Sequence, residues 1–216
     1  MGGFWAWRNT PIAQHVVALM GGSFDPFHLG HQAMVSQALS LPKVQQVWLM
    51  PVGVAIHRQL SGQSNAFQRL AWVEKIYENV PRVRVLDWEV QNTHPTSTLE
   101  TLQRLHQTHP QHMPLLLLGA DAFNGLEQWY GYPQHQDLCN ICVFPRQGTV
   151  IRCLDGWKKA SGSWHETAGH VLKMRYELLD ISSTHIRAQA KQGLALTEMV
   201  NASLVQEIED CYGGLN

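Results

Sequence analysis

Short apolar runs alternate with segments of helical pattern from residue 16 to the end of the chain. The apolar runs cover residues 16–20, 44–50, 82–90, 114–121, 140–145 and 170–174. The helical segments cover residues 31–39, 64–80, 96–106, 182–193 and 200–214. Strands that are apolar throughout must be covered on both faces, and their alternation with helices is typical of parallel sheets. We therefore predict an α/β fold with a doubly wound, mostly parallel sheet of about five or six strands and residues 16–20 buried at its centre.

The length, composition and net charge of the chain limit the classes of protein to which it can belong. The chain has 216 residues, 44% of them hydrophobic, which is enough for one core and predicts a single domain over residues 1–216. The formal net charge of -1 argues against a nucleic-acid partner. No run approaches the roughly 18 apolar residues of a membrane helix, and the N-terminus lacks a secretory signal, so we expect a cytoplasmic protein without membrane contact. Whether the chain forms a homo-oligomer stays open.

Two segments stand apart from this pattern. Residues 1–14, with their tryptophans, form an N-terminal extension before the first apolar run. Residues 147–169 are polar and carry several glycines and serines, which predicts a surface excursion.

Cys139 and Cys142 form a CxxC pair in the apolar segment "LCNICVFP". On a strand, residues three apart point to opposite faces, so the two thiols cannot hold one metal ion. We interpret them as buried core cysteines and predict no protein metal site there.

The stretch "GGSFDPFHLGH" links the first apolar run to the first helix. A glycine pair after a strand lets a ligand approach the backbone, and the start of the helix offers free N–H groups to an anion. His28 and His31 are three residues apart, which places both imidazoles on one side of the first turn. Two donors beside a helix N-terminus suit a phosphate chain, although two ordinary surface histidines are the alternative.

A second candidate anion site is "ISSTHIR", residues 181–187. Ser182 and Ser183 are good N-cap residues, and Arg187 lies about one turn into the helix, where a cation opposes the helix dipole. An anion bound at the helix start would remove that conflict. His57 and Arg58 follow the second apolar run and add two further phosphate donors at the same expected edge of the sheet.

Taken together, these motifs resemble bacterial nicotinate-nucleotide adenylyltransferases, within the HxGH nucleotidyltransferase superfamily. "GGSFDPFHLGH" matches the family's first motif without a gap, and "ISSTHIR" matches its ISSTxIR. "LLLGADAFNGLEQWYGY" resembles the segment that holds Gly-x-Asp and a downstream tryptophan, here Trp129. The resemblance runs from about residue 16 to the C-terminus and implies the Rossmann-like nucleotidyltransferase fold.

The resemblance implies ATP and nicotinate mononucleotide as substrates, with Mg²⁺ held mainly by the ATP phosphates. It implies that the adenylyl group of ATP passes to nicotinate mononucleotide, giving deamido-NAD and pyrophosphate. The catalytic residues implied are His28, His31 and Arg187. The ATP-binding residues implied are Gly21, Gly22, Ser23, Phe24, Asp25, His28, His31, Arg58, Gly119, Asp121, Ile181, Ser182, Ser183 and Arg187. The acceptor-binding residues implied are His57, Thr98, Trp129 and Arg146.

The chain departs from the family pattern in loops around the substrates. Ala55 and Ile56 stand where the family has two prolines, and Ser97 stands where it has a tyrosine. Gln147 replaces a proline after Arg146. Two other functions therefore stay open: a sister transferase that uses another phosphate-bearing acceptor, such as nicotinamide mononucleotide or phosphopantetheine, and a catalytically silent nucleotide-binding paralogue.

Overall fold

The computed structural model describes residues 15–54, 63–176 and 178–214. Its strands are β1 (His15–Gly22), β2 (Val44–Pro51), β3 (Val83–Val85), β4 (His112–Gly119), β5 (Asn140–Phe144), β6 (Lys158–Lys159) and β7 (His170–Lys173). Its α-helices are α1 (Leu29–Leu39), α2 (Ala66–Tyr77), α3 (Thr98–Thr108), α4 (Ala120–Asn124), α5 (Ser183–Lys191) and α6 (Val205–Tyr212). Short 3-10 turns cover Leu126–Gln128, Gln134–Asp137 and Ala202–Leu204.

The strands form one seven-stranded sheet in the order β3-β2-β1-β4-β5-β7-β6, and every described strand pair is parallel. β1 lies between β2 and β4, with Leu19 paired to Trp48 on one side and to Leu116 on the other. The side chains from Val16 to Met20 are all buried. The prediction of a doubly wound parallel sheet with a buried first strand is confirmed.

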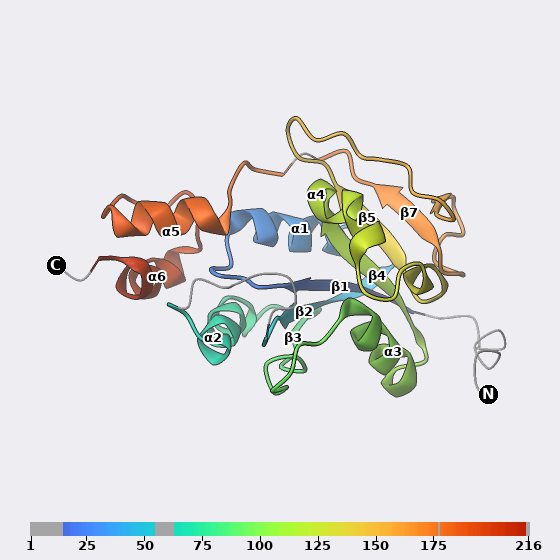
Figure 1. Ribbon diagram of the computed structural model, residues 1–216, viewed down its shortest axis with the longest axis horizontal. Coiled ribbons are helices and arrows are strands. Elements are labelled where there is room, and N and C mark those ends of the chain that lie inside the picture. Colours follow the sequence, from blue (N-terminus) through green and yellow to red (C-terminus); the bar gives the residue numbers. More distant parts are fainter. Residues whose placement is uncertain (1–14, 55–62, 177, 215–216) are drawn as a thin grey trace.

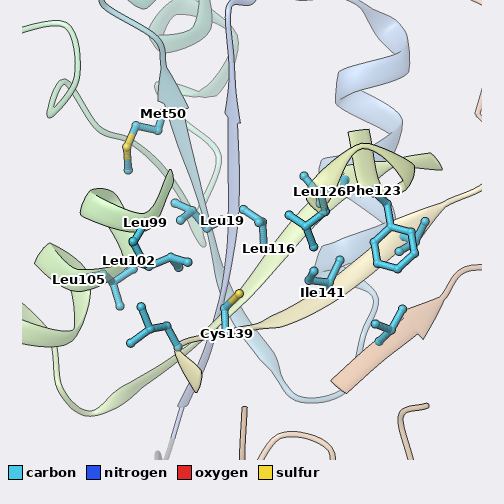
Figure 2. Packing of buried hydrophobic residues seen from close by; sticks show 14 of the residues in the cluster. Leu19, Met50, Leu99, Leu102, Leu105, Leu116, Phe123, Leu126, Cys139 and Ile141 are labelled. Atoms are coloured by element: carbon cyan, nitrogen blue, oxygen red, sulfur yellow. The ribbon is translucent and has the colours of Figure 1, made fainter. Parts of the chain in front are cut away.

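Helices cover both faces of the sheet (Figure 1). On one face, Leu99, Leu102 and Leu105 of α3 pack against Leu19 and Leu116 of the central strands, as Figure 2 shows. The opposite face is covered by α1 and α2. A third apolar cluster joins α2 to α5 and α6, which lie side by side beyond the sheet. The last two helices are therefore fixed to the sheet through α2.

The structure corrects some expected boundaries. The strand expected over residues 82–90 is only β3, because the chain keeps one more hydrogen bond to β2, from the N–H of Leu86 to the carbonyl of Leu49, and then forms a turn over residues 88–91. The sheet has one strand more than expected, because β6 lies within the segment 147–169. That segment is mostly exposed, yet its Leu154 is buried in the core.

Cys139 and Cys142 are both buried free thiols, and they pack into the two apolar clusters on opposite faces of the sheet. Burial raises the pKa of the Cys142 thiol to about 12 and raises that of Cys139 as well. These thiols stay protonated at neutral pH, so their interpretation as core residues is confirmed.

Candidate functional site

A cavity of about 370 Å³ opens where β1 and β4 end and the loops to α1 and α4 begin. In parallel α/β sheets, ligands bind at this carboxyl edge. Its floor is the end of β1 and the loop that follows, and an added Cβ at Gly22, the last residue of β1, would lie 2.7 Å from the ring of Phe24. Phe24 has a positive φ of 48° and packs edge-on against Phe27, with both rings buried. Aromatic packing therefore fixes the loop from below.

His28 and His31 cap α1 by accepting each other's backbone N–H. The Nδ1 of His28 accepts the N–H of His31 at 3.4 Å, and the Nδ1 of His31 accepts the N–H of His28 at 3.3 Å. The two rings stack with their centroids 3.7 Å apart, on one side of the first turn. Because both Nδ1 atoms are acceptors, we assign the proton of each neutral ring to Nε2, which is the atom left to donate to a ligand.

Both imidazoles are neutral at pH 7. Burial, with a smaller contribution from Arg146, lowers the pKa of His28 to about 4. Burial and the neighbouring His28 hold the pKa of His31 well below its usual value. The pair therefore offers hydrogen-bond donors rather than positive charge.

The described residues that line the cavity supply one Lys or Arg side chain, that of Arg146. Its guanidinium lies 3.6 Å from the carboxylate of Asp121 and 3.1 Å from that of Asp180. The N-terminus of α5 also meets the cavity, through Ser182, Ser183 and Thr184. Ser182 caps this helix by accepting the N–H of His185 at 3.2 Å, as its sequence position predicts. Two helix N-termini and one arginine thus converge on one hollow, an arrangement suited to an anion.

Most of the predicted ATP-binding residues lie together. Those that line this cavity are Gly21, Gly22, Ser23, Phe24, His28, His31, Gly119, Asp121, Ile181, Ser182 and Ser183. Arg146, expected at the acceptor, lies in the same cavity. His57 and Arg58 lie outside the described residues.

Asp25 and Arg187 are not among the residues that line this cavity, although Nη2 of Arg187 donates to the hydroxyl of the lining residue Thr184 at 3.3 Å. The carboxylate of Asp25, only 2% exposed, accepts hydrogen bonds from the hydroxyls of Ser64 and, at 2.5 Å, of Tyr212. Arg187 donates Nη1 to the backbone carbonyl of Asp25 at 2.6 Å and lies 3.8 Å from its carboxylate. Buried Arg69 donates to the carbonyl of Ser23 in the same loop. Residues from α2, α5 and α6 therefore hold the loop that carries the histidines.

Thr98 and Trp129 belong to a neighbouring part of the structure. Thr98 is the first residue of α3, and Trp129 follows a 3-10 turn and packs against the core. The two segments touch, because a Cβ at Gly131, where φ is +77°, would lie 2.2 Å from the side chain of Leu99. Neither Thr98 nor Trp129 lines the histidine cavity.

Sequence reasoning missed part of the cavity wall. The additional lining residues are Gly30, Met34, Ala122, Leu178, Leu179 and Thr184. Ala122 directly follows the "GAD" motif and Leu178 and Leu179 lie just before "ISST", so proximity to a motif was the available signal. The structure also shows that Ser64, Arg69 and Tyr212 support the site, and their sequence surroundings carry no such signal.

A doubly wound parallel sheet with an anion-suited cavity at its carboxyl edge defines an α/β protein whose ligand site lies at the ends of the central strands. The model of the cytidylyltransferase-like family matches residues 19–189. Among curated proteins, the chain is 30% identical over 200 residues to a probable nicotinate-nucleotide adenylyltransferase of Shewanella pealeana, covering 89% of this chain and 92% of that protein. It is 31% identical to one of a Synechococcus species, covering 87% and 88% of the two chains.

Solved structures show the same fold. The Plasmodium falciparum nicotinic acid mononucleotide adenylyltransferase complexed with NaAD superposes with a TM-score of 0.72 at 15% identity, covering 91% of this chain and 95% of that one. A putative nicotinate-nucleotide adenylyltransferase from Vibrio parahaemolyticus gives a TM-score of 0.62 at 16% identity, covering 90% and 98%. The chain belongs to the cytidylyltransferase-like family and, within it, to the nicotinate-nucleotide adenylyltransferases.

The neutral state of His28 predicts a pH-dependent stability. The unfolded state takes up a proton near pH 6.5, whereas the folded state resists it down to about pH 4. Stability from this group is therefore complete above about pH 6.5 and is lost as the pH falls towards 4. Between pH 7 and pH 5, the wild type should lose about 2 kcal/mol more unfolding free energy than His28→Asn, whose amide can still cap α1.

Urea unfolding at several pH values measures this difference. His109, His112 and His135 also have lowered pKa values, but both proteins share them, so their contributions cancel in the comparison. The variant also removes the smaller effect of His28 on the pKa of His31, which changes the pH dependence in the same direction as the loss of His28 itself. Parallel pH dependences of the two proteins would show that His28 is not held neutral by the fold.

Because the hydroxyl of Tyr212 donates a buried hydrogen bond to Asp25, we predict that removing this one oxygen atom lowers stability. Tyr212→Phe should lower the unfolding free energy by about 2 kcal/mol, because a hydrogen bond to a buried carboxylate is lost. Tyr130→Phe is the matched control, since that side chain is 67% exposed and should change stability by less than about 0.5 kcal/mol. Equal midpoints for both variants in urea would contradict the interpretation.

Proposed function

We propose that this chain transfers the adenylyl group of ATP to nicotinate mononucleotide, which forms deamido-NAD and pyrophosphate in NAD biosynthesis. The observation that carries the proposal is the convergence of His28, His31, Arg146 and the N-termini of α1 and α5 on one cavity. The curated relatives bear the name of this activity, and the Plasmodium structures were solved with NaAD and with APC. The four free cysteines agree with a reducing cytoplasm as the place of reaction.

The chemistry needs alignment more than a strong base. A phosphate oxygen of the mononucleotide attacks the α-phosphorus of ATP, a new P–O bond forms, and the bond to the β-phosphate breaks with release of pyrophosphate. The attacking phosphate has a second pKa near 6, so it is largely dianionic at neutral pH. The protein must hold the two phosphates in line and stabilise the charge that grows on the leaving group.

The residues present suit that task. The two Nε2–H groups can donate to ATP phosphates without a change of protonation state, and Arg146 adds positive charge beside them. Arg187, held by Asp25, is one turn from the capped start of α5 and fixes the loop next to this site. We assign catalytic roles to His28 and His31 on this basis, and a positioning role to Arg187.

Magnesium is proposed to arrive with ATP. Asp121 is the one carboxylate among the described residues that line the cavity, and Arg146 pairs with it. A protein cage of several oxygen ligands would be needed to hold Mg²⁺ directly, whereas the ion commonly binds through substrate phosphates. The residues therefore fit an ion held mainly by ATP, which would neutralise phosphate charge.

The acceptor is proposed to bind between the start of α3 and Trp129. The capping box of α3 uses the backbone N–H groups of Ser97 and Glu100, and it leaves those of Thr98 and Leu99 for a ligand. These donors and the positive end of the helix favour a carboxylate over a neutral amide. Ser97, which replaces a family tyrosine, is itself consumed by this cap.

Pyrophosphate release from ATP tests the function. We expect turnover with nicotinate mononucleotide, at least tenfold lower kcat/KM with nicotinamide mononucleotide, and none with phosphopantetheine. Trp129→Ala should raise KM for the mononucleotide about tenfold through lost stacking, while the exposed neighbour variant Tyr130→Ala should not. Equal kcat/KM for both mononucleotides would overturn the acceptor assignment, and no turnover with any acceptor would overturn the activity.

His31→Ala should lower kcat about 100-fold and change KM for ATP much less, because the lost donor acts on charge that grows in the transition state. His31→Gln, which keeps an amide N–H near the position of Nε2, should recover part of that loss. Steady-state kinetics with varied ATP separate the two parameters. A raised KM for ATP with unchanged kcat would assign His31 to ground-state binding alone.

A further inference from the structure

A second cavity of about 530 Å³ lies at the edge of the sheet where β6 and β7 end. Its apolar wall is supplied by Leu41, Phe123, Leu154, Val171, Leu172 and Met174. None of these residues lines the histidine cavity, so the two hollows have separate walls. The volume is in the range of small-molecule sites.

Apart from the thiol of Cys153, the polar side chains of the described residues that line this second cavity are all donors. They are the cations of Arg152, Lys158, Lys159 and Lys173, together with the indole of Trp157. The Nε1 atom of Trp157 is buried and has no hydrogen-bond partner in the described part of the chain. No aspartate or glutamate is among the described lining residues.

The three lysines differ from Arg152 in how their charge is balanced. Arg152 lies 3.0 Å from the carboxylate of Glu127 and donates to the carbonyl of Asn124 at 3.1 Å. Within the described ranges, Lys158, Lys159 and Lys173 make no ion pair. An apolar hollow with uncompensated positive charge at its rim is complementary to a molecule with an apolar body and one negative head group.

We infer that this cavity is a binding site for a small amphipathic anion, such as a medium-chain carboxylate. The apolar body would displace water from the leucine and valine wall, and the head group would lie between Lys159 and Lys173, which share the Val171 face of the sheet edge. Lys158, next to Lys159 on β6, belongs to the other face and adds charge only at a distance. Lysines at a sheet edge also discourage pairing with another strand, and that role requires no ligand. The experiment below distinguishes the two roles.

Isothermal titration calorimetry of the full chain with decanoate below its micelle concentration tests the site. We expect one saturable binding event, with decan-1-ol at least tenfold weaker because it lacks the charge. The double variant Lys159→Gln/Lys173→Gln should weaken decanoate binding about tenfold through the loss of two charge contacts. Lys191→Gln, an exposed lysine on α5, is the matched control and should bind like the wild type.

Ala160→Phe adds a second, charge-independent test, because a ring at this lining position should fill the cavity and abolish binding. Circular dichroism checks the fold of each variant, and the lysine pair still tests the site if Ala160→Phe unfolds. No saturable binding, equal affinity for acid and alcohol, or wild-type affinity in the lysine variant would each overturn the inference. Titrations without ATP keep these outcomes independent of the proposed adenylyl transfer.

Discussion

The buried carboxylate of Asp25 is the point at which the separate parts of this site are joined. Ser64 from the start of α2, Arg187 from α5 and Tyr212 from α6 all bond to this one residue. A carboxylate that is almost fully buried is stable only if its oxygens are hydrogen-bonded and its charge is balanced. The folding of the C-terminal helices onto α2 is therefore coupled to the shape of the loop that carries His28 and His31.

The geometry of the same loop explains why His28 and His31 are neutral. Each Nδ1 caps α1, and protonation of either ring would convert that acceptor into a donor and break the cap. Burial acts in the same direction, because it disfavours the charged form. The helix start is thus capped by two side chains that also line the cavity, and the cap itself sets their tautomer. Among the described residues that line the cavity, positive charge is left to Arg146.

The sequence was sufficient to predict the centre of the sheet, because the central strands are apolar on both faces and few other folds accommodate that pattern. It was insufficient to predict the strands at the two edges of the sheet. β3 is short because the chain forms a turn over residues 88–91. β6 is a two-residue strand within a polar segment, and it pairs with β7. Periodicity over two or three residues carries no usable signal.

The residues of the candidate site also fall into two groups: those that the sequence could identify and those that it could not. Residues within "GGSFDPFHLGH" and "ISSTHIR" were found because motif and location coincide at the ends of strands and the starts of helices. The support from Ser64, Arg69 and Tyr212 could not be found, because each is distant in sequence and its polar group is committed only by tertiary packing. The sequence predicts Arg187 at the anion site, and the structure shows its guanidinium donating both to the backbone carbonyl of Asp25 and to the hydroxyl of Thr184, which lines the cavity.

The two cavities share one short element, α4, and this has consequences for any ligand in the second one. Asp121 and Ala122 face the histidine cavity, and Phe123 faces the other. The end of α4 is tied to the following segment by Asn124, which bonds to the carbonyl of Val150 and the N–H of Arg152. Arg152 lines the second cavity, and Arg146 at the other end of that segment pairs with Asp121.

A ligand in the second cavity can alter the first only if it binds two arrangements of α4 with different affinity. An anion that draws Arg152 away from Asn124 would meet this condition, since it would exchange a contact that holds α4 for one of its own. By linkage, ATP would then change the affinity for that anion by the same factor. An anion that contacts the lysines alone would leave α4 untouched and would bind independently of ATP. The position of the head group relative to Arg152 therefore decides whether the second cavity is a separate site or a coupled one.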